Sequence, residues 1–246
     1  MFERVDAFVQ ALNASSSEAA LADALEQISK ELGFSYYALT HHVDIRQAPQ
    51  RAIRLDNYPP QWVEYFDDNK LGPSDPVHRA SHMTGAGFTW SQLSSLIQLT
   101  PRDLEILERA GGNGLGDGFT VPAHVPGESN GSCSFATRVG EAVPAERLVE
   151  AQLVGIFAFE AARRLWRVRG EMPLPLKLTD RQRDCVLWVA RGKSDWEISQ
   201  ILGISEETVI QHLKQARGRY GVSRRTMLAV SALFDGSISF SDILKR

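Results

Sequence analysis

The chain has 246 residues, of which 43% are hydrophobic and 23% are charged, with a net charge of −3 at pH 7. This length suggests two domains. No apolar run reaches the ~20 residues that cross a membrane, the N-terminus has no signal-peptide pattern, and the two cysteines have no metal-ligand spacing. We therefore expect a cytoplasmic protein without membrane contact, metal or cofactor.

The first 168 residues alternate between helix and strand patterns. Ser15 and Glu18 are spaced as a capping box ahead of an amphipathic helix, and Thr100 is the expected N-cap of another. We expect an α/β sandwich, an antiparallel sheet flanked by helices, which is large enough to enclose a small-molecule cavity. Five segments are predicted strands, the last two joined by a hairpin loop at 127–131: residues 34–41, 52–55, 87–90, 119–125 and 132–139.

An aromatic segment is the candidate for ligand chemistry. Tyr58, Trp62 and Phe66 precede an Asp75-Pro76 pair, and Trp90 follows. Aromatic stripes more often form plain core, and a carboxylate before proline more often caps a helix than accepts from a ligand N–H. The residues by themselves leave both interpretations open.

Patterns typical of enzymes or metal sites are missing from the sequence. The tract Gly111–Gly118 follows a helix and fits neither the dinucleotide fingerprint nor the P-loop, so it predicts a helix end and a turn. No serine lies in a nucleophile elbow. We expect no catalytic site, and structural or exposed roles for five histidines without metal-ligand spacing: His41, His42, His78, His82 and His124.

A proline-containing segment separates the two predicted domains. A long amphipathic helix over about 145–168 gives way to residues 169–176, whose two prolines cannot continue it. We therefore predict a domain of residues 1–168, a short linker over 169–176, and a second domain of residues 177–246. The second domain has 12 Lys and Arg against 8 Asp and Glu, or +4, and the rest of the chain carries −7. This difference in charge indicates that the two domains have different functions.

The C-terminal domain is patterned as four short helices. Thr179, Ser194 and Ser205 are the expected N-caps of the first three, and Gly192 and Gly203 end the first two. A helix that ends at Gly, a two-residue turn and a newly capped helix make a tight helix-helix corner. The second helix has an apolar side at helical spacing: Trp196, Ile198, Ile201 and Leu202.

The third helix of this domain, about 206–220, has two different faces. Val209, Leu213 and Ala216 are spaced to pack inward, whereas Ile210, Gln211, Lys214 and Arg217 share the outer face. A major groove admits one α-helix, whose side chains reach base edges while Lys and Arg neutralise phosphates. An isolated basic cluster would more often be a solvated surface, but here it coincides with the helix-helix corner. The pattern therefore favours DNA binding.

These spacings resemble the LuxR-type helix-turn-helix. Matching residues are Leu178-Thr179, Arg181, Gly192-Lys193, Glu197-Ile198, Leu202-Gly203-Ile204-Ser205, Thr208-Val209, His212-Leu213 and Gly221-Val222. Ile210 departs from the family, which commonly has at this position a Lys that touches DNA. The resemblance implies a DNA-binding surface made of Lys193, Ser205, Thr208, Ile210, Gln211, Lys214 and Arg217.

Tyr58, Trp62, Asp75-Pro76, Trp90 and Gly118 resemble the spaced positions of the acyl-homoserine-lactone-binding domain of LuxR-type quorum-sensing receptors. The resemblance implies that Trp62 donates to the lactone carbonyl and Asp75 accepts from the ligand amide. It further implies that Tyr58 and Ser134 bind the acyl carbonyl, that Trp90 walls the pocket, and that Ala38 leaves room for the chain. Phe66 stands where the family usually has Tyr, so a hydroxyl is missing.

Together these features are similar to those of a quorum-sensing transcriptional regulator. The resemblance implies an N-acyl homoserine lactone as ligand and a homodimer on an inverted-repeat operator, with RNA polymerase as a further candidate partner. Dimer contacts are expected along helices 145–168 and 229–233. Three alternatives are a LuxR-type regulator that responds to another small molecule, an enzyme fused to the DNA-binding module, and a response regulator. A response regulator needs an acidic pair directly after its first strand. Here the acidic pair Asp67-Asp68 follows an aromatic helix, which argues against that alternative.

Overall fold

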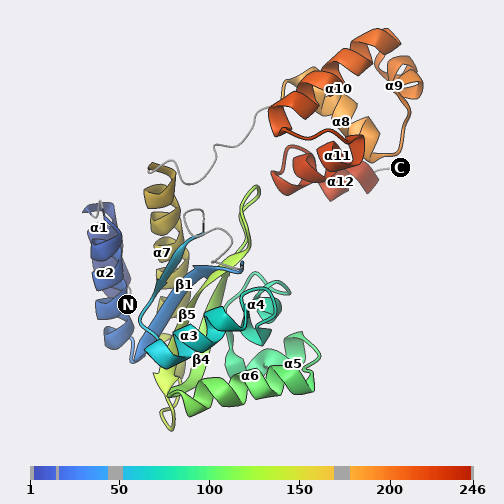
Figure 1. The fold of residues 1–246 in the computed structure, drawn as a ribbon. Helices are drawn as coiled ribbons and strands as arrows, with labels where there is room; N and C mark the ends of the chain where they lie inside the picture. Colours follow the sequence, from blue (N-terminus) through green and yellow to red (C-terminus); the bar gives the residue numbers. More distant parts are fainter. Residues whose placement is uncertain (1–2, 15–16, 44–51, 169–177, 245–246) are drawn as a thin grey trace. The chain divides into compact units, whose positions relative to one another are not determined.

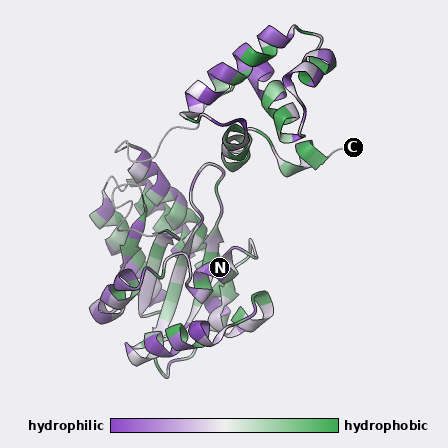
Figure 2. Ribbon diagram, turned by 45° about the vertical axis from the view of Figure 1, so that its right-hand side comes forward, coloured by the Kyte–Doolittle hydropathy of each residue, from purple (hydrophilic) through white to green (hydrophobic). Residues whose placement is uncertain are grey.

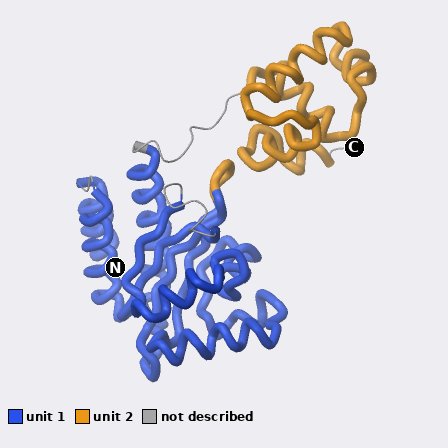
Figure 3. Tube along the Cα trace, viewed as in Figure 1, with its two compact units in different colours: residues 1–124, 129–173 blue, residues 125–128, 174–246 orange. Residues whose placement is uncertain are grey.

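The computed structural model describes residues 3–14, 17–43, 52–168 and 178–244. These form two compact units, residues 1–124 with 129–173 and residues 125–128 with 174–246 (Figure 3). The predicted linker, residues 169–176, lies outside the described residues. The domain limits 1–168 and 177–246 therefore stay a prediction.

Unit 1 is built on a five-stranded antiparallel sheet with strand order β2-β1-β5-β4-β3. All five predicted strands are present, with shifted ends. β4 begins at Leu115 rather than Phe119, so half of the glycine-rich tract predicted as a turn is strand, with a register irregularity between Leu115 and Gly118. The strands are β1 (Tyr36–His41), β2 (Arg54–Asp56), β3 (Phe88–Thr89), β4 (Leu115–Ala123) and β5 (Gly131–Arg138).

Helices cover both faces of this sheet, which confirms the predicted α/β sandwich (Figure 1). One face carries α1 (Glu3–Ala14), α2 (Glu18–Glu31) and α7 (Leu148–Val168), the last preceded by the short turn η2 (Ala145–Arg147). The other face carries α3 (Pro60–Asp68), α4 (Pro76–Ser81), η1 (Trp90–Gln92), α5 (Leu93–Leu96) and α6 (Pro101–Gly112). The outward sides of these helices are largely hydrophilic, which leaves apolar side chains for the interior (Figure 2).

The central strands present different side chains to the two faces. Along β5, Cys133 and Phe135 belong to the large apolar core shared with α1, α2 and α7. Successive side chains alternate across a sheet, so Ser132 and Ser134 face α3–α6. Ser134 pairs with Ala38 on β1 and with Thr120 on β4. Small side chains therefore form the floor under the second helical layer.

Helix caps in unit 1 agree with the sequence at one position and correct it at another. Thr100 caps α6, as predicted from the pattern, and the structure adds a reciprocal capping box with Asp103. The N-cap of α2 is Ser17, whose hydroxyl accepts from the backbone N–H of Ala20 at 3.2 Å. The capping box predicted at Ser15 is wrong, because the helix begins directly after Ser17; Ser15 itself lies outside the described residues.

Unit 2 is all-helical, with its own core around Cys185, Ile198, Val209 and Leu228. Thr179, Ser194 and Ser205 cap the first three helices as predicted. The predicted four helices are joined by a fifth, shorter one at the C-terminal end. They are α8 (Asp180–Ala190), α9 (Asp195–Leu202), α10 (Glu206–Tyr220), α11 (Arg225–Phe234) and α12 (Phe240–Leu244).

The predicted apolar side of α9 is only half correct. Ile198 is fully buried and Leu202 packs against the core, but Trp196 is 60% exposed and Ile201 43% exposed. Helical spacing placed all four residues near one side, yet this eight-residue helix turns only a narrow strip toward its neighbours. The apolar character of Trp196 and Ile201 is therefore a surface property.

Candidate ligand pocket and DNA-reading helix

A pocket lies between the sheet and helices α3, α4 and α6, with an empty volume of about 750 Å³ that includes open solvent at its mouth. All seven residues that the sequence singled out for ligand binding line it, although they come from five different parts of the chain. They are Ala38, Tyr58, Trp62, Phe66, Asp75, Trp90 and Ser134.

Helix α3 supplies the aromatic wall. It starts at Pro60, whose fixed φ suits the first helical position, and Trp62 and Phe66 follow one turn apart on one side. Their rings meet edge to face with centroids 5.8 Å apart. Trp62 is buried, and its Nε1–H has no acceptor among the described residues. This donor is available to a bound molecule.

Asp75 caps helix α4. Its Oδ1 accepts from the backbone N–H of His78 at 3.0 Å, and Pro76 occupies the first helical position. The helix-cap interpretation of the Asp-Pro pair is therefore confirmed. The carboxylate is almost fully buried, and within the described part of the chain Oδ2 has no hydrogen-bond partner. The cap fixes the group while leaving one oxygen as an acceptor.

Tyr58 adds a second donor to the pocket. Burial raises the pKa of its phenol well above the ordinary value, and the nearby carboxylates of Asp56 and Asp75 raise it further. The hydroxyl therefore stays protonated and can donate. Trp62, Tyr58 and Asp75 together offer two donors and one charged acceptor around one cavity.

Trp90 is held in the wall by a buried hydrogen-bond chain. Its Nε1–H donates to Thr120 Oγ1 at 2.9 Å, and Thr120 Oγ1 lies 2.8 Å from Ser134 Oγ. The Trp90 donor is thus satisfied by the protein, in keeping with a wall role. When Thr120 donates to Ser134, the Ser134 proton is free to point at a ligand oxygen.

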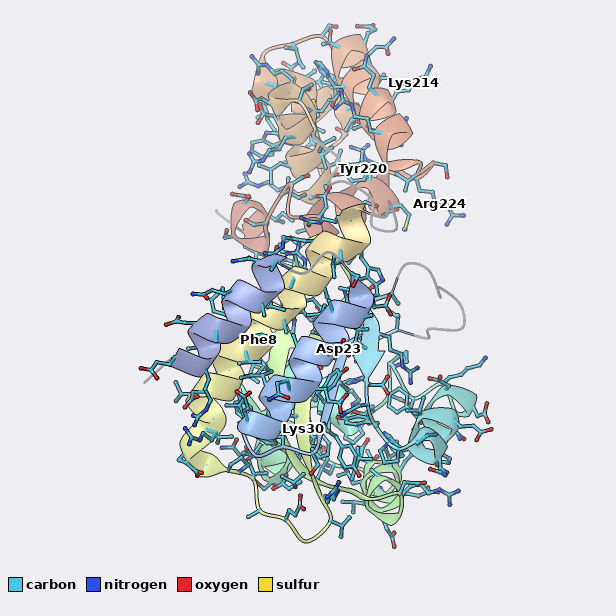
Figure 4. The ribbon with its side chains drawn as sticks, turned by 90° about the vertical axis from the view of Figure 1, so that its left-hand side faces the viewer. Phe8, Asp23, Lys30, Lys214, Tyr220 and Arg224 are labelled. Atoms are coloured by element: carbon cyan, nitrogen blue, oxygen red, sulfur yellow. The ribbon has the colours of Figure 1, made fainter. Side chains whose placement is uncertain are left out.

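The outer face of α10 is the candidate DNA-reading surface. Ile210, Gln211 and Lys214 are exposed, and their side chains have no ion pair or hydrogen bond within the described residues. Lys214 lies on the outer edge of the helix, away from the other helices of unit 2 (Figure 4). Arg217 lies three positions after Lys214, about one helical turn further along α10, and is half-buried. These side chains are presented for contact with a groove.

The other predicted DNA contacts have structural partners. The Ser205 hydroxyl accepts from the backbone N–H of Thr208 at 3.2 Å and lies 2.9 Å from the Thr208 hydroxyl. Lys193 forms an ion pair of 2.9 Å with Glu197. That bond, with the cap bonds from Ser194, lowers the pKa of Glu197 to about 2. These bonds orient the starts of α9 and α10, so the predicted contact residues Lys193, Ser205 and Thr208 lie at helix N-termini.

Two family models match the chain. Residues 17–165 match the autoinducer binding domain, and residues 176–232 match the bacterial regulatory proteins of the luxR family. The chain belongs to the LuxR family of transcriptional regulators. This family is not one of enzymes, which confirms the expectation that the protein has no catalytic role. Its N-terminal domain takes a small-molecule ligand rather than a cofactor.

Relatives cover nearly the whole of this LuxR-family chain. The quorum sensing-dependent regulator RpaR of Rhodopseudomonas palustris is 31% identical over 223 residues, 89% of this chain and 88% of its own. The activator LuxR of Aliivibrio fischeri is 26% identical over 218 residues, 87% and 86% of the two chains. The crystal structure of Escherichia coli SdiA shares the fold, with a TM-score of 0.70 and 24% identity over 98% of both chains.

Sequence reasoning did not single out as ligand contacts the polar lining residues Arg54, Asp56 and His78, nor Thr120, which lies behind Trp90. The predicted loop at 127–131 did not reveal Thr120, because it pairs residue 126 with 132 and so Thr120 with Arg138, whereas the strands pair Thr120 with Ser134. Arg54 and Asp56 join the pocket through the pairing of β2 with β1, across the undescribed residues 44–51. No local pattern marks them.

Gly118 keeps the Trp90 wall in place, and its replacement by Ala should be destabilising. A Cβ there would lie 2.6 Å from Trp90 Cε2 and 2.7 Å from the backbone oxygen of Phe135. We expect the free energy of unfolding to fall by about 1–3 kcal/mol, measured by denaturant titration. Gly111→Ala on α6 is the control, because a Cβ there meets nothing within 4 Å. Equal stability of the two variants would contradict this account.

Histidines cluster beside the pocket rather than at a metal site. His42 stacks on His78 with centroids 3.8 Å apart, and its Nδ1 lies 3.0 Å from His82 Nε2. His124 meets the edge of His82. No group of three or more His, Cys, Asp or Glu among the described residues is arranged to hold a metal ion. The predicted structural role of these side chains fits this packing.

This cluster should make stability fall in acid. Burial lowers the pKa of His42 well below 6.5, and the neighbouring His78, His82, His41 and His124 lower it further. Because the folded pKa is depressed, the stabilisation is complete above pH 6.5 and is lost as pH falls below it. We expect the free energy of unfolding, measured across that range, to decline less steeply in His42→Gln. Identical slopes would assign the pH dependence to other groups.

No helix within the described residues combines the length and the apolar character needed to cross a membrane.

Proposed function

We propose that this regulator binds an N-acyl homoserine lactone in the pocket of unit 1 and, as a homodimer, an inverted-repeat operator through α10. The observation that carries the ligand half is the set of polar groups left free in a largely apolar cavity. Asp75 Oδ2 accepts from the ligand amide N–H, Trp62 Nε1–H donates to the lactone carbonyl, and Tyr58 with Ser134 binds the acyl carbonyl. A charged acceptor opposite an amide makes the strongest of these bonds.

The small floor and the apolar walls account for the acyl chain. Ala38 and Ser134 face each other across adjacent strands, so no large side chain fills this side of the pocket. Val77, Ile106 and Leu115 line it with apolar surface. An acyl chain laid over this floor gains burial in proportion to its length. Trp90 and Phe66 close the polar end.

Another acyl ligand is the competing possibility. A solved structure with 23% identity and a TM-score of 0.69 is SdiA in complex with octanoyl-rac-glycerol, an ester that has no amide N–H. The buried Asp75 acceptor can be paired by an amide N–H or by one of the two free hydroxyls of such a glycerol ester, so retention of the two ligand classes by the protein decides between them. The response-regulator alternative loses support, since residues 17–165 match an autoinducer binding domain.

The dimer proposal rests on two exposed apolar surfaces. On α7, Val149, Ile156 and Phe157 are 65%, 47% and 41% exposed and recur at helical spacing. On α11, Val230 and Phe234 are exposed one turn apart. Both helices were the dimer contacts expected from sequence. Two copies on DNA also offset the mild +4 charge of one DNA-binding domain.

Two-fold symmetry predicts an operator of roughly 18–20 base pairs, with half-sites about one helical turn apart. Such a regulator acts in the cytoplasm, with RNA polymerase as its partner at promoters.

Ligand that fills the cavity stabilises the folded state by about 2.7 kcal/mol at a hundredfold excess over Kd. We propose that this gain favours the dimer that binds DNA. Operator affinity measured with and without ligand tests the sign of the switch.

Mass spectrometry of the ligand retained by the full chain tests the proposal. The protein is expressed with a mixed panel of N-acyl homoserine lactones and of monoacyl glycerols, purified, and denatured to release what it holds. Retention of a lactone by the wild type, and its loss in Trp62→Phe without unfolding, is the expected result. Retention of acyl glycerols alone would replace the ligand assignment. Ultracentrifugation of the liganded protein with operator DNA tests the dimer, and a monomer on DNA would overturn it.

A further inference from the structure

A buried imidazole in the pocket wall has no role in the lactone scheme above. His78 on α4 lines the pocket and is 8% exposed. Its Nδ1 lies 2.7 Å from the carbonyl oxygen of Gly72. A carbonyl oxygen only accepts, so Nδ1 carries the proton and donates. In the neutral ring Nε2 is then an acceptor, and it has no hydrogen-bond partner among the described residues.

The ring of His78 is fixed by its neighbours. His42 stacks on one face with an interplanar angle of 12°, and Phe66 packs against the ring at 69° with centroids 5.7 Å apart. The bond to Gly72 sets the direction of the remaining nitrogen. With Nδ1 bonded to Gly72 and the ring held between His42 and Phe66, the wall presents Nε2 as a preoriented acceptor.

The Nε2 acceptor needs a hydrogen-bond donor, and a bound ligand must supply it. Phe66, the side chain packed against His78, has no hydroxyl. Water can donate to Nε2 in an open pocket, but an acyl chain without a donor displaces that water and leaves a buried acceptor unpaired. A hydroxyl on the chain restores the bond. The two kinds of ligand then differ by one buried hydrogen bond.

We propose that His78 Nε2 accepts a hydrogen bond from a hydroxyl on the acyl part of the ligand, so that the pocket selects hydroxylated N-acyl homoserine lactones over unsubstituted ones of equal chain length. This inference rests on the proposed function and names the ligand class within it. His78 acts as a specificity-determining residue, separate from the Asp75 and Trp62 groups that hold the lactone end.

The test is a competition within one sample. Full-length protein is expressed with equimolar pairs of lactones of equal chain length, one unsubstituted and one hydroxylated, the hydroxyl being moved along the chain from pair to pair. Mass spectrometry then gives the ratio retained. We expect the wild type to prefer the hydroxylated member by about three- to tenfold at one hydroxyl position. A ratio within one sample does not depend on how much protein folds.

Two variants distinguish loss of the Nε2 acceptor from a general effect on folding. His78→Asn keeps an N–H for Gly72 but places nothing at the Nε2 position, so the ratio should fall to about one. His78→Gln puts an amide oxygen near that position and should keep the preference. Equal retention of both lactones by the wild type, or a preference unchanged in His78→Asn, would overturn the inference while leaving the proposed function intact. Retention of no lactone at all would overturn both.

Discussion

Replacing Asp75 by Ala should reduce retention of the lactone about 10- to 150-fold, the largest effect of any single pocket change. The substitution leaves the buried ligand amide unpaired, and hydrogen bonds to charged groups contribute about 1.5–3 kcal/mol. It also removes the cap of α4, because Oδ1 accepts from the N–H of His78. Loss of a cap costs about 0.5–2 kcal/mol of stability. Ligand content per folded protein, by mass spectrometry and circular dichroism, measures the effect.

Two further variants separate the cap from the ligand bond. Asp75→Asn keeps a cap acceptor of equal rank but removes the charge, so the fold should persist while affinity still falls. Thr100→Ala removes the cap of α6 instead and leaves the pocket lining unchanged. If Thr100→Ala lowers ligand retention as much as Asp75→Ala, general instability rather than the amide bond explains the loss.

Lys214→Ala should weaken DNA binding at least about tenfold at physiological salt. A symmetric dimer loses two phosphate contacts, which lowers the slope of log affinity against log salt by about 1.8. Fluorescence anisotropy of labelled operator over a range of salt concentrations gives both quantities. Ile210→Lys should change the slope in the opposite direction, since it adds a cation on the same exposed face.

Lys30→Ala is the matched control for charge. Lys30 lies on α2 in unit 1 and pairs with Glu26 in the same helix (Figure 4). Removing it changes the net charge of the protein equally but takes nothing from α10. Equal salt slopes for Lys30→Ala and Lys214→Ala would show that overall charge, and not a groove contact, governs binding.

Local chemistry predicted the parts of this fold that depend on neighbouring residues. Thr100, Thr179, Ser194 and Ser205 each cap the helix that the sequence placed after them, because a cap is decided within four residues. Ser17, and not the predicted Ser15, caps α2, because the helix begins at Glu18 directly after Ser17.

Features that depend on distant pairing were not predictable. The exposure of Trp196 is set by which side of α9 meets α8 and α10, and helical spacing does not determine that. The Trp90–Thr120–Ser134 chain needs three strands to be in register. The pocket residues came from resemblance rather than periodicity. Asp75 shows why: the helix cap and the ligand acceptor are two oxygens of one carboxylate, and the sequence pattern predicts only the first.

The order of strands also determines when the pocket can exist during synthesis. β1 is an inner strand whose central partner is β5, and Leu39 pairs with Cys133, 94 positions later in the chain. At translation rates of ~5–20 residues per second, β1 waits on the order of 5 to 20 s for that partner. Until β5 docks, Ala38 has no Ser134 beside it and the floor of the cavity is absent. A signal molecule can therefore be captured only after the nascent chain has passed β5, and the apolar strands remain open to misassociation until then.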